Sequence, residues 1–411
     1  MTLLPSPPSI LALISLVTLA LLGAPARSAE ETAIRVATFN LEDVRTSDLH
    51  NPEHPRLKKI AEIIQRIRPN VILLNEIAYD TPDAPGVETD AQAGQNARLF
   101  VERFLSVEQA PGLKPIAYDT FMARPNTGFP SGHDLDRSGE VVSAYPDPGE
   151  PNEDGSPPRQ TAEGRAFGGD AWGFGTFPGQ YAMALLVDSR LTIRRDDART
   201  FRLFPWSYMP GSLRPIVPET GDPWYDGEVA DRMRLSSKSH WDVPVELPGG
   251  ELVHFLCSHP TPPAFDGPEG RNKRRNHDEI RFWADYLEDA GYLVDDNSKP
   301  GGLGPDQHFV ILGDLNADPD EGSSLYNPIG RLLLASNRLA VAPPPASDVV
   351  IEKLDPDDTA RFGLRVDYVL PSRSLRPIRS GVWRHGADEG DFPSDHFPVW
   401  MDLGVPAPDA P

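Results

Sequence analysis

The sequence predicts a layered α/β fold, because short runs rich in β-branched and aromatic residues are separated by helical patterns. Each run ends in, or carries, a polar residue suited to metal binding or acid–base chemistry. The runs are IRVATFNLED, NVILLNEI, ELVHFLCSHP, HFVILGDLN, LRVDYVLPS and DFPSDHFPVWMDL. Since the ends of buried strands form one rim in such folds, we expect these polar residues to meet there.

Two helices are predicted between these runs. In RLKKIAEIIQRIRP, leucine and isoleucine recur on one helical face, and Pro69 ends the helix. The second helix follows the basic stretch RNKRRNH and places Ile280, Trp283 and Leu287 at helical spacing. Because the first helix lies between two strand patterns, the chain is expected to open with a strand, a helix and a strand.

The composition fits one domain with long surface loops. The chain has 411 residues, of which 39% are hydrophobic, and we expect a single domain over residues 30–404. Its 45 prolines and 34 glycines gather in stretches such as residues 143–158, which indicate loops. Residues from about 119 to 180 are interpreted as an insertion, and residues 405–411 as a disordered tail.

The first 29 residues are expected to be a signal peptide. An apolar run over residues 10–22 is broken only by Ser15 and Thr18, and small residues suited to cleavage follow near Ala26 and Ala29. The run is shorter than the ~20 residues that cross a bilayer, which disfavours a membrane anchor. We therefore expect export to the periplasm or the extracellular medium.

Charge and cysteine content limit the classes of partner. The formal net charge of −22 repels polyanions, which counts against a simple nucleic-acid-binding protein. It does not exclude a nuclease, because divalent cations and a local basic patch can reverse the field. The single cysteine, Cys257, excludes an intrachain disulfide, and no disulfide-linked partner is inferred. It lies in the apolar run LVHFLC and is interpreted as a small buried side chain.

The stretch GDLN follows one of the strand patterns. Gly313 permits a tight turn, and Asp314 and Asn316, at alternate positions, can point to the same side. A carboxylate and an amide suit a water or phosphate group held near Mg²⁺. Taken alone, such a stretch after a strand is more often an ordinary turn.

Six motifs in this order are together specific: FNLE, LNEI, SHP, GDLN, RVDYVLPS and SDHFPVW. With them the chain resembles the endonuclease/exonuclease/phosphatase superfamily, which includes pancreatic deoxyribonuclease, apurinic endonucleases, neutral sphingomyelinases and inositol-polyphosphate phosphatases. The resemblance implies a four-layer, deoxyribonuclease I-like fold, in which helices flank a two-sheet β-sandwich. Here that fold would carry long Pro/Gly-rich loop insertions.

The resemblance also implies roles for nine residues. It assigns catalysis to His259, Asp314, Asn316, Asp367 and His396, and metal binding to Glu76, Asn40, Asp395 and Glu42. Glu76 would be the principal ligand of Mg²⁺ or Mn²⁺, and Asp314 would orient or deprotonate the attacking water. Glu42 stands where some members have Asp. These residue types suit phosphodiester hydrolysis, which needs an oriented water and neutralised non-bridging oxygens.

Basic residues suggest a substrate-binding side. Arg271, Lys273, Arg274 and Arg275 are expected at the start of the second helix, where the helix N-terminus and basic side chains favour phosphate. The alternative is a solvated basic turn on an acidic surface. Two further residues, Arg165 and His240, could line the cleft or serve buried structural roles.

The stretch DLDRSGE resembles the opening of a calcium loop, with Asp134, Asp136 and Ser138 before Gly139. The twelfth position would be Tyr145 rather than Glu, so this is no EF-hand. A structural Ca²⁺ and an ordinary Asp-rich turn are both open.

Three functions fit the sequence. The first is a secreted metal-dependent nuclease that hydrolyses DNA or RNA. The second is a sphingomyelinase-like phospholipid phosphodiesterase, in which FRLFPWSYMP (residues 201–210) would form an aromatic hairpin that contacts a membrane surface, unless this loop is packed. The third is a non-catalytic phosphate-binding module of the same fold.

Overall fold

The computed structural model describes residues 1–2, 31–82, 84–387, 390 and 392–407. Nearly all of the expected signal peptide, and residues 408–411 of the expected tail, lie outside these residues. Within the described part of the chain, no helix has both the length and the apolar character needed to cross a membrane.

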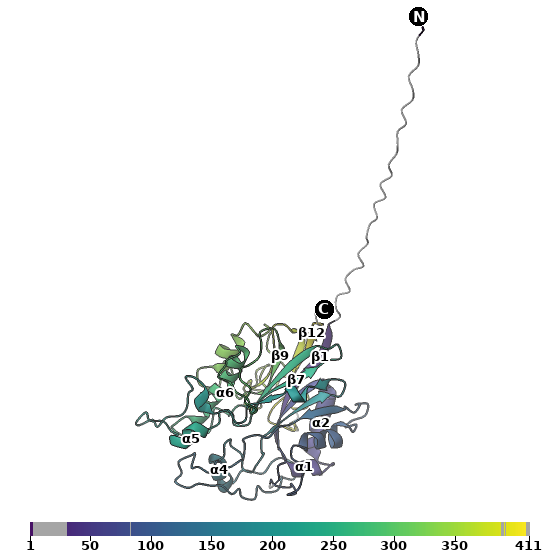
Figure 1. Cartoon of the computed structure of the whole chain (residues 1–411). Coiled ribbons are helices and arrows are strands. Elements are labelled where there is room, and N and C mark those ends of the chain that lie inside the picture. Colours follow the sequence, from purple (N-terminus) through teal and green to yellow (C-terminus); the bar gives the residue numbers. More distant parts are fainter. Residues whose placement is uncertain (3–30, 83, 388–389, 391, 408–411) are drawn as a thin grey trace.

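Two six-stranded sheets form the centre of the molecule (Figure 1). The first has the order β11-β12-β1-β2-β4-β3, with β1 and β2 parallel. The second has the order β10-β9-β8-β7-β5, and β6 pairs with β7. The bounds of the first sheet are β1 (Thr32–Val44), β2 (Val71–Ile77), β3 (Tyr118–Phe121), β4 (Met183–Asp188), β11 (Arg376–Val382) and β12 (Val399–Val405). Those of the second are β5 (Thr192–Ile193), β6 (Arg199–Thr200), β7 (His240–Glu246), β8 (Leu252–Ser258), β9 (His308–Asp314) and β10 (Asp367–Pro371).

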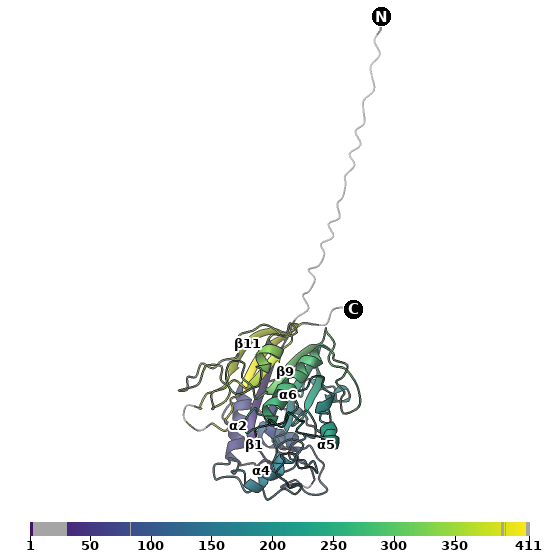
Figure 2. The same ribbon diagram turned by 90° about the vertical axis from the view of Figure 1, so that its left-hand side faces the viewer.

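Helices cover both outer faces, which gives four layers (Figures 1 and 2). The α-helices are α1 (Thr46–His50), α2 (Pro55–Ile67), α3 (Asn96–Phe100), α4 (Ala162–Gly169), α5 (Gly227–Arg232) and α6 (Arg271–Leu287). The π-helical segments are η1 (Val101–Leu105) and η4 (Ile329–Leu334), and the 3₁₀ turns are η2 (Arg195–Asp197) and η3 (Trp206–Tyr208). The predicted α/β sandwich with flanking helices is therefore confirmed.

Three hydrophobic clusters separate the layers, and strand alternation explains them. In β1, Ile34 and Val36 join the cluster between the two sheets, whereas Ala37 and Phe39 join the cluster beneath α2. In β9, Val310 and Leu312 face the other sheet, and neighbouring residues pack toward α6. Each strand thus buries both faces, which is why its sequence is a continuous apolar run.

Both predicted helices are present. Helix α2 begins with Pro55 in its first turn and ends at Ile67, where Arg68 caps it with a left-handed φ of 53° before Pro69. Its leucine and isoleucine face packs on the first sheet. Helix α6 begins at Arg271 and buries Ile280, Trp283 and other apolar residues against the second sheet. Cys257 is buried between the sheets, as predicted.

Three boundary or loop predictions need correction. Residues 119–121, expected in the insertion, belong to β3, which pairs with β4 at the sheet edge. Val405, expected in the tail, is the buried last residue of β12 and pairs with Thr32. The loop at residues 201–210 is packed rather than an exposed hairpin, because Phe201, Phe204 and Trp206 are buried against the second sheet.

Candidate active site

Strand alternation brings the predicted polar residues to one open end of the sandwich. Asp314 continues the inward-facing series of β9, and Asp367 begins the inward-facing series of β10, in which Val369 joins the inter-sheet cluster. His259 continues the inward series of β8 in the same way. Asn75 links the sheets, because its Oδ1 accepts hydrogen bonds from Thr38 Oγ1 and from the Asp314 amide, each at 3.3 Å.

Unusual backbone angles turn the ends of the first two strands. Glu76 has φ of 63° and Glu42 has φ of 53°, values that non-glycine residues seldom adopt. The pairing of β1 with β2 also shifts register between Asn40 and Val44, as at a β-bulge. By simple alternation the Glu76 side chain would follow Leu74 toward α2. The turn instead places its Oε1 3.2 Å from Asn40 Nδ2, at the open end of the sandwich.

The Oδ2 atom of Asp314 lies at the centre of this end. It accepts hydrogen bonds from Asn40 Nδ2 at 3.0 Å and from Asn316 Nδ2 at 3.3 Å. His259 Nε2 lies 3.4 Å away and His396 Nε2 3.8 Å away. Burial alone would raise the pKa of Asp314, but the two histidines hold it well below its usual value. Asp314 is therefore an anion at neutral pH.

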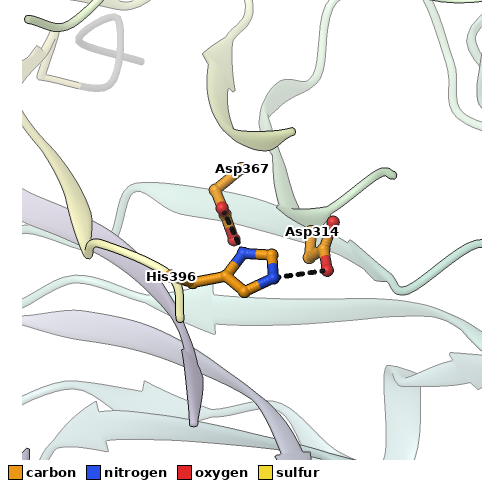
Figure 3. Close-up of side chains that lie close together, drawn as sticks. All are labelled: Asp314, Asp367 and His396. Carbon is orange, nitrogen blue, oxygen red and sulfur yellow. Dashed lines mark hydrogen bonds and ion pairs between the residues drawn. The ribbon is translucent and has the colours of Figure 1, made fainter. Parts of the chain in front are cut away.

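His396 stands between two carboxylates (Figure 3). Its Nδ1 is 2.8 Å from Asp367 Oδ2, and its Nε2 faces Asp314. Burial would lower the pKa of His396, but the charges of Asp367 and Asp314 raise it well above its usual value. Burial also raises the pKa of Asp367 to about 6, against the opposing charge of His396. The geometry therefore favours an imidazolium with its Nε2–H directed at the centre of the site.

His259 is the second imidazole of the site and is neutral. Burial, followed by the charge of Lys238, lowers the pKa of His259 to about 4. Burial lowers the pKa of Lys238, and the charges of Glu279, Glu76 and Asp314 oppose this effect. No sequence pattern pointed to Lys238, because a lysine between serines just before a strand gives no signal of burial. The ammonium adds positive charge to a site that otherwise gathers carboxylates.

The acidic residues fit a hard divalent cation. The half-buried Glu76 carboxylate has a pKa raised to about 7, first by burial and then by the charge of Asp395. Burial and the charge of Asp395 also raise the pKa of Glu42. A bound cation would stabilise the charged forms of these carboxylates, and their oxygens are the donors that Mg²⁺ and Mn²⁺ prefer. This donor set therefore fits the predicted metal.

Asn40 is better described as a bridge than as a metal ligand. Its Nδ2 donates to Glu76 and Asp314, and its Oδ1 accepts from the Glu42 amide at 3.0 Å. Both ends of the amide are therefore used within the protein. The group of Asp314, Asp367 and His396 is also compact enough to hold an ion, but both ring nitrogens of His396 already face the two carboxylates.

The basic stretch at the start of α6 is largely structural, contrary to prediction. The Arg275 guanidinium is buried and donates to the carbonyls of Leu235, Trp172 and Arg234. The Arg271 guanidinium donates to other carbonyls, including Leu135 O at 3.3 Å.

The N-terminus of α6 is also occupied. Asp266 accepts hydrogen bonds from the amides of Asn272 and Lys273 and lies 3.9 Å from Lys273 Nζ. The first amides of the helix therefore already hold an anion from the protein itself, which leaves little for a substrate phosphate. Arg274 is half-buried and remains a prediction.

Two other predicted substrate residues lie elsewhere. His240 is buried, its Nε2 donates to Glu279 O at 2.8 Å, and its ring packs on Phe282 and Trp283 of α6. Arg165 is exposed on α4 and donates to Gln160 O at 2.8 Å. His240 is therefore structural, and Arg165 contacts its own helix start rather than the catalytic residues.

The Asp-rich loop gathers three carboxylates. Asp134 and Asp136 lie with Asp170, so that one oxygen of each is within 4.8 Å of the others. The expected ligand Ser138 instead donates its amide to Asp134 and Asp136. Both oxygens of Asp170 also accept backbone amides. The hydrogen bonds explain the loop without an ion, and a structural Ca²⁺ stays a prediction.

A comparison with known protein families shows which family the chain belongs to. A sequence profile described as "Endonuclease/Exonuclease/phosphatase family" matches residues 37–396, which span most of the chain and contain all nine predicted catalytic and metal-binding positions. The chain belongs to the endonuclease/exonuclease/phosphatase family. Members of this family are generally hydrolases that act on phosphoester bonds, and they usually depend on a divalent metal.

Solved structures similar to the chain include an endonuclease/exonuclease/phosphatase from Beutenbergia cavernae, with 19% identity, a TM-score of 0.49, and coverage of 92% of this chain and 73% of that one. Human Nocturnin, solved as its catalytic domain with bound sulfate, has 14% identity, a TM-score of 0.45, and coverage of 91% and 95%. A mannosyl-6-phosphatase from Bacteroides thetaiotaomicron has 14% identity, a TM-score of 0.41, and coverage of 90% and 99%. No curated protein matches the chain.

Proposed function

We propose that this protein is an exported phosphodiesterase that depends on Mg²⁺ or Mn²⁺ and hydrolyses DNA or RNA. The observation that carries the proposal is the pairing of a cationic His396 with an anionic Asp314 beside the Glu76 carboxylate. Metal-dependent hydrolysis of a phosphoester needs three groups: a positive donor for the phosphoryl oxygens, an acceptor that orients water, and a ligand for a divalent cation.

Glu76 and Asp395 would hold the metal ion, with Glu42 beside them. When bound, Mg²⁺ or Mn²⁺ supplies Lewis acidity that neutralises charge on the non-bridging oxygens of the phosphate. Asn40 keeps the Glu76 carboxylate in place through its Nδ2 atom. Asp43 contributes a second support, because its amide donates to Glu76 Oε2 at 3.2 Å.

Asp314 would orient the attacking water. Its low pKa makes it a weak proton acceptor, so we assign it to directing the water lone pair along the line of attack. Four polar nitrogen atoms around its Oδ2 fix the carboxylate in one orientation. The neutral His259 contributes to this orientation, because its Nε2 lies 3.4 Å from Asp314 Oδ2.

His396 would stabilise the phosphoryl group in the transition state. Asp367 fixes the ring through Nδ1, which leaves the Nε2–H to donate to a phosphoryl oxygen. Because the ring carries a positive charge before substrate arrives, no proton needs to move to create it. Such preorganised donors are worth more where negative charge develops than in the ground state.

Nucleic acid is favoured over a phospholipid by the loop at residues 201–210. The aromatic side chains that would enter a membrane, such as Phe204 and Trp206, are buried within the protein. Leu203 and Tyr208 are exposed, at 43% and 60%, but two side chains form a small apolar surface. Export is proposed from the apolar run and cleavage pattern at the start of the sequence.

The test is hydrolysis by the purified protein of duplex DNA, single-stranded RNA and sphingomyelin vesicles, with Mg²⁺, with Mn²⁺ and with a chelator. We expect metal-dependent cleavage of nucleic acid. The Asp314→Asn variant should lose at least a thousandfold in rate, because it removes the charge at the centre of the site.

The matched control is His308→Ala, at the opposite end of β9 from Asp314, where the ring contacts Ser374. It should keep its rate. Cleavage of vesicles alone would show a lipid phosphodiesterase, and binding of metal with no hydrolysis of any substrate would show a non-catalytic module. Either result would contradict the nuclease proposal.

A further inference from the structure

Three arginines that are far apart in the sequence come together near the catalytic centre. They are Arg124, Arg202 and Arg234, named here the arginine cluster. The buried side chain of Asn126 holds them: its Nδ2 donates to Arg202 O at 2.7 Å, and its Oδ1 accepts from Arg234 Nη1. Arg124 precedes Asn126 by two residues. The cluster is thus built around a buried polar residue rather than scattered over a surface.

Two guanidinium groups of the cluster stack on aromatic rings. Arg124 lies 4.0 Å from the centre of the Phe129 ring, and Arg234 lies 4.7 Å from that of Trp172. A stacked guanidinium keeps its N–H donors in one plane, free at their edges for a planar or tetrahedral anion. Within the described part of the chain, the side chains of Arg124 and Arg202 form no hydrogen bond or ion pair. Donors are therefore left for a ligand.

The positive charges of the cluster are poorly compensated. Burial and the charges of Arg202 and Arg124 lower the pKa of Arg234 to about 10. The carboxylate of Asp296 is the acid that opposes them, and it already accepts from Thr200 Oγ1 and from the amides of Arg202 and Leu203. In a chain of net charge −22, such mutual repulsion marks a place where an anion would be stabilising.

The cluster is linked to the catalytic centre by two short routes. The Asn126 amide donates to the carbonyl of Lys238, whose ammonium interacts with Glu76 and Asp314. Tyr79 follows Glu76 by three residues, a span of at most ~11 Å, and the charges of Arg124 and Arg202 act on its hydroxyl. One substrate molecule can therefore reach both places.

Phosphate chemistry fits this position better than the headgroup of sphingomyelin. Guanidinium forks match the oxygens of a phosphate and bind them in pairs. A phosphocholine headgroup would instead bring a quaternary ammonium close to three arginines, which repel it. A nucleic-acid strand carries one phosphate at every nucleotide, so a strand bound at the catalytic centre can present a neighbouring phosphate to the cluster.

We propose that the arginine cluster is a second phosphate-binding subsite, which holds a backbone phosphate of a nucleic-acid strand within a few nucleotides of the bond that is cleaved. This inference rests on the proposed function and gives it a substrate requirement. Longer strands are better substrates than dinucleotides, because only longer strands carry a phosphate that reaches the cluster.

The test compares the wild type with the double variant Arg124→Gln/Arg202→Gln, in which neither side chain supports the fold through a hydrogen bond. Three substrates are used: bis(4-nitrophenyl) phosphate, a thymidine dinucleotide, and a thymidine 12-mer. We expect kcat/KM to fall at least tenfold for the 12-mer and to change less than twofold for the other two. The salt dependence of the 12-mer should weaken by about 0.7 in the log–log slope, the value for one lost phosphate contact on a single strand.

The matched control is Arg98→Gln/Arg190→Gln. These arginines are exposed and pair with Glu102 and Asp188. Their substitution removes the same formal charge as the test variant. The control should keep its preference for the 12-mer. An equal loss on short and long substrates, or no loss, would overturn the inference while leaving the proposed hydrolase intact.

A binding experiment separates this inference from the proposed activity. Fluorescence anisotropy measures a labelled 12-mer bound to Asp314→Asn protein, with and without the two arginine substitutions. A tenfold larger dissociation constant in the substituted protein supports the subsite even if no hydrolysis is found. Unchanged binding of the 12-mer overturns the inference. Binding of the same two proteins to phosphatidylserine-containing vesicles is measured in parallel. If the arginine substitutions weaken only vesicle binding, the cluster belongs to a lipid-binding surface and the inference is also overturned.

Discussion

His396 and His240 are both buried histidines at or just before the start of a strand, but their surroundings leave His396 charged and His240 neutral. His396 has a carboxylate at each ring nitrogen, and its pKa is raised well above the usual value. His240 has a backbone carbonyl at one nitrogen and aromatic rings beside it, and burial lowers its pKa to about 4. Burial alone therefore does not tell a catalytic histidine from a structural one. The neighbouring charges do.

The comparison predicts a large difference in rate between two histidine variants. His396→Ala should lower kcat/KM for nucleic-acid hydrolysis by about a thousandfold or more, because it removes the cation that faces the phosphoryl group. His240→Gln, which can keep a donor to Glu279 O, should stay within about threefold. Steady-state kinetics on folded variants measure both. Similar losses for the two would show that His240 acts in the site after all.

A second prediction changes the charge beside His396 without removing the ring. Asp367→Asn should lower the rate about a hundredfold and move the pKa of His396 down toward its usual value. Since the protonated ring is the active form, the variant should lose rate as pH rises through about 6.5, whereas the wild type keeps its rate to higher pH. Rate profiles from pH 5.5 to 8.5 test this.

The control for this variant is Asp402→Asn, which removes a carboxylate on β12 that pairs with Arg35 on β1. Its pH profile should match that of the wild type. If Asp367→Asn also leaves the profile unchanged, the charge of Asp367 does not set the state of His396.

A third prediction concerns stability and His240. Its folded pKa of about 4 lies below the unfolded value near 6.5, so protons bind the unfolded chain more tightly. The stability that the neutral ring contributes is complete above pH 6.5 and is lost as pH falls toward 4. The total is about 3 kcal/mol, from 1.36 kcal/mol for each pKa unit.

Urea unfolding at pH 7.5 and pH 4.0 measures this loss. The wild type should lose about 3 kcal/mol more than His240→Gln over this interval, since the variant has no ring to protonate. Equal losses in the two proteins would mean that His240 is not kept neutral by the fold.

The smallest effect is expected at Lys238. The charge of this ammonium helps to lower the pKa of His259, so Lys238→Met should raise that pKa from about 4 by about one unit. The rate should fall about tenfold, because the variant also removes a positive charge near Glu76 and Asp314. Titration of the imidazole by NMR measures the pKa, and Lys58→Met, on the exposed face of α2, is the control. An unchanged pKa would place the cause in burial alone.

Much of the fold and the centre of the site could be predicted because the signals are local. The apolar strands, the face of α2 and the proline after it are patterns within a few residues. Asp314 and Asp367 could be named because each lies at the end of a strand, where alternation decides the face. Strand ends at one rim then bring them together.

The substrate-binding side could not be predicted in this way. Consecutive residues of a helix point in directions about 100° apart, so the dense basic stretch at Arg271–Arg275 cannot present one charged face. Arg275 points inward and binds carbonyls. The structure instead gathers Arg124, Arg202 and Arg234, which no local pattern connects.

The sequence by itself determined the family, the layered fold and the polar strand ends, because hydrophobic periodicity and motif order are properties of neighbouring residues. Only the tertiary structure decided which histidine is charged, which lysine is buried beside the carboxylates, and which arginines share one place. These properties depend on distances and desolvation between residues that are far apart in the chain, and no local pattern encodes them.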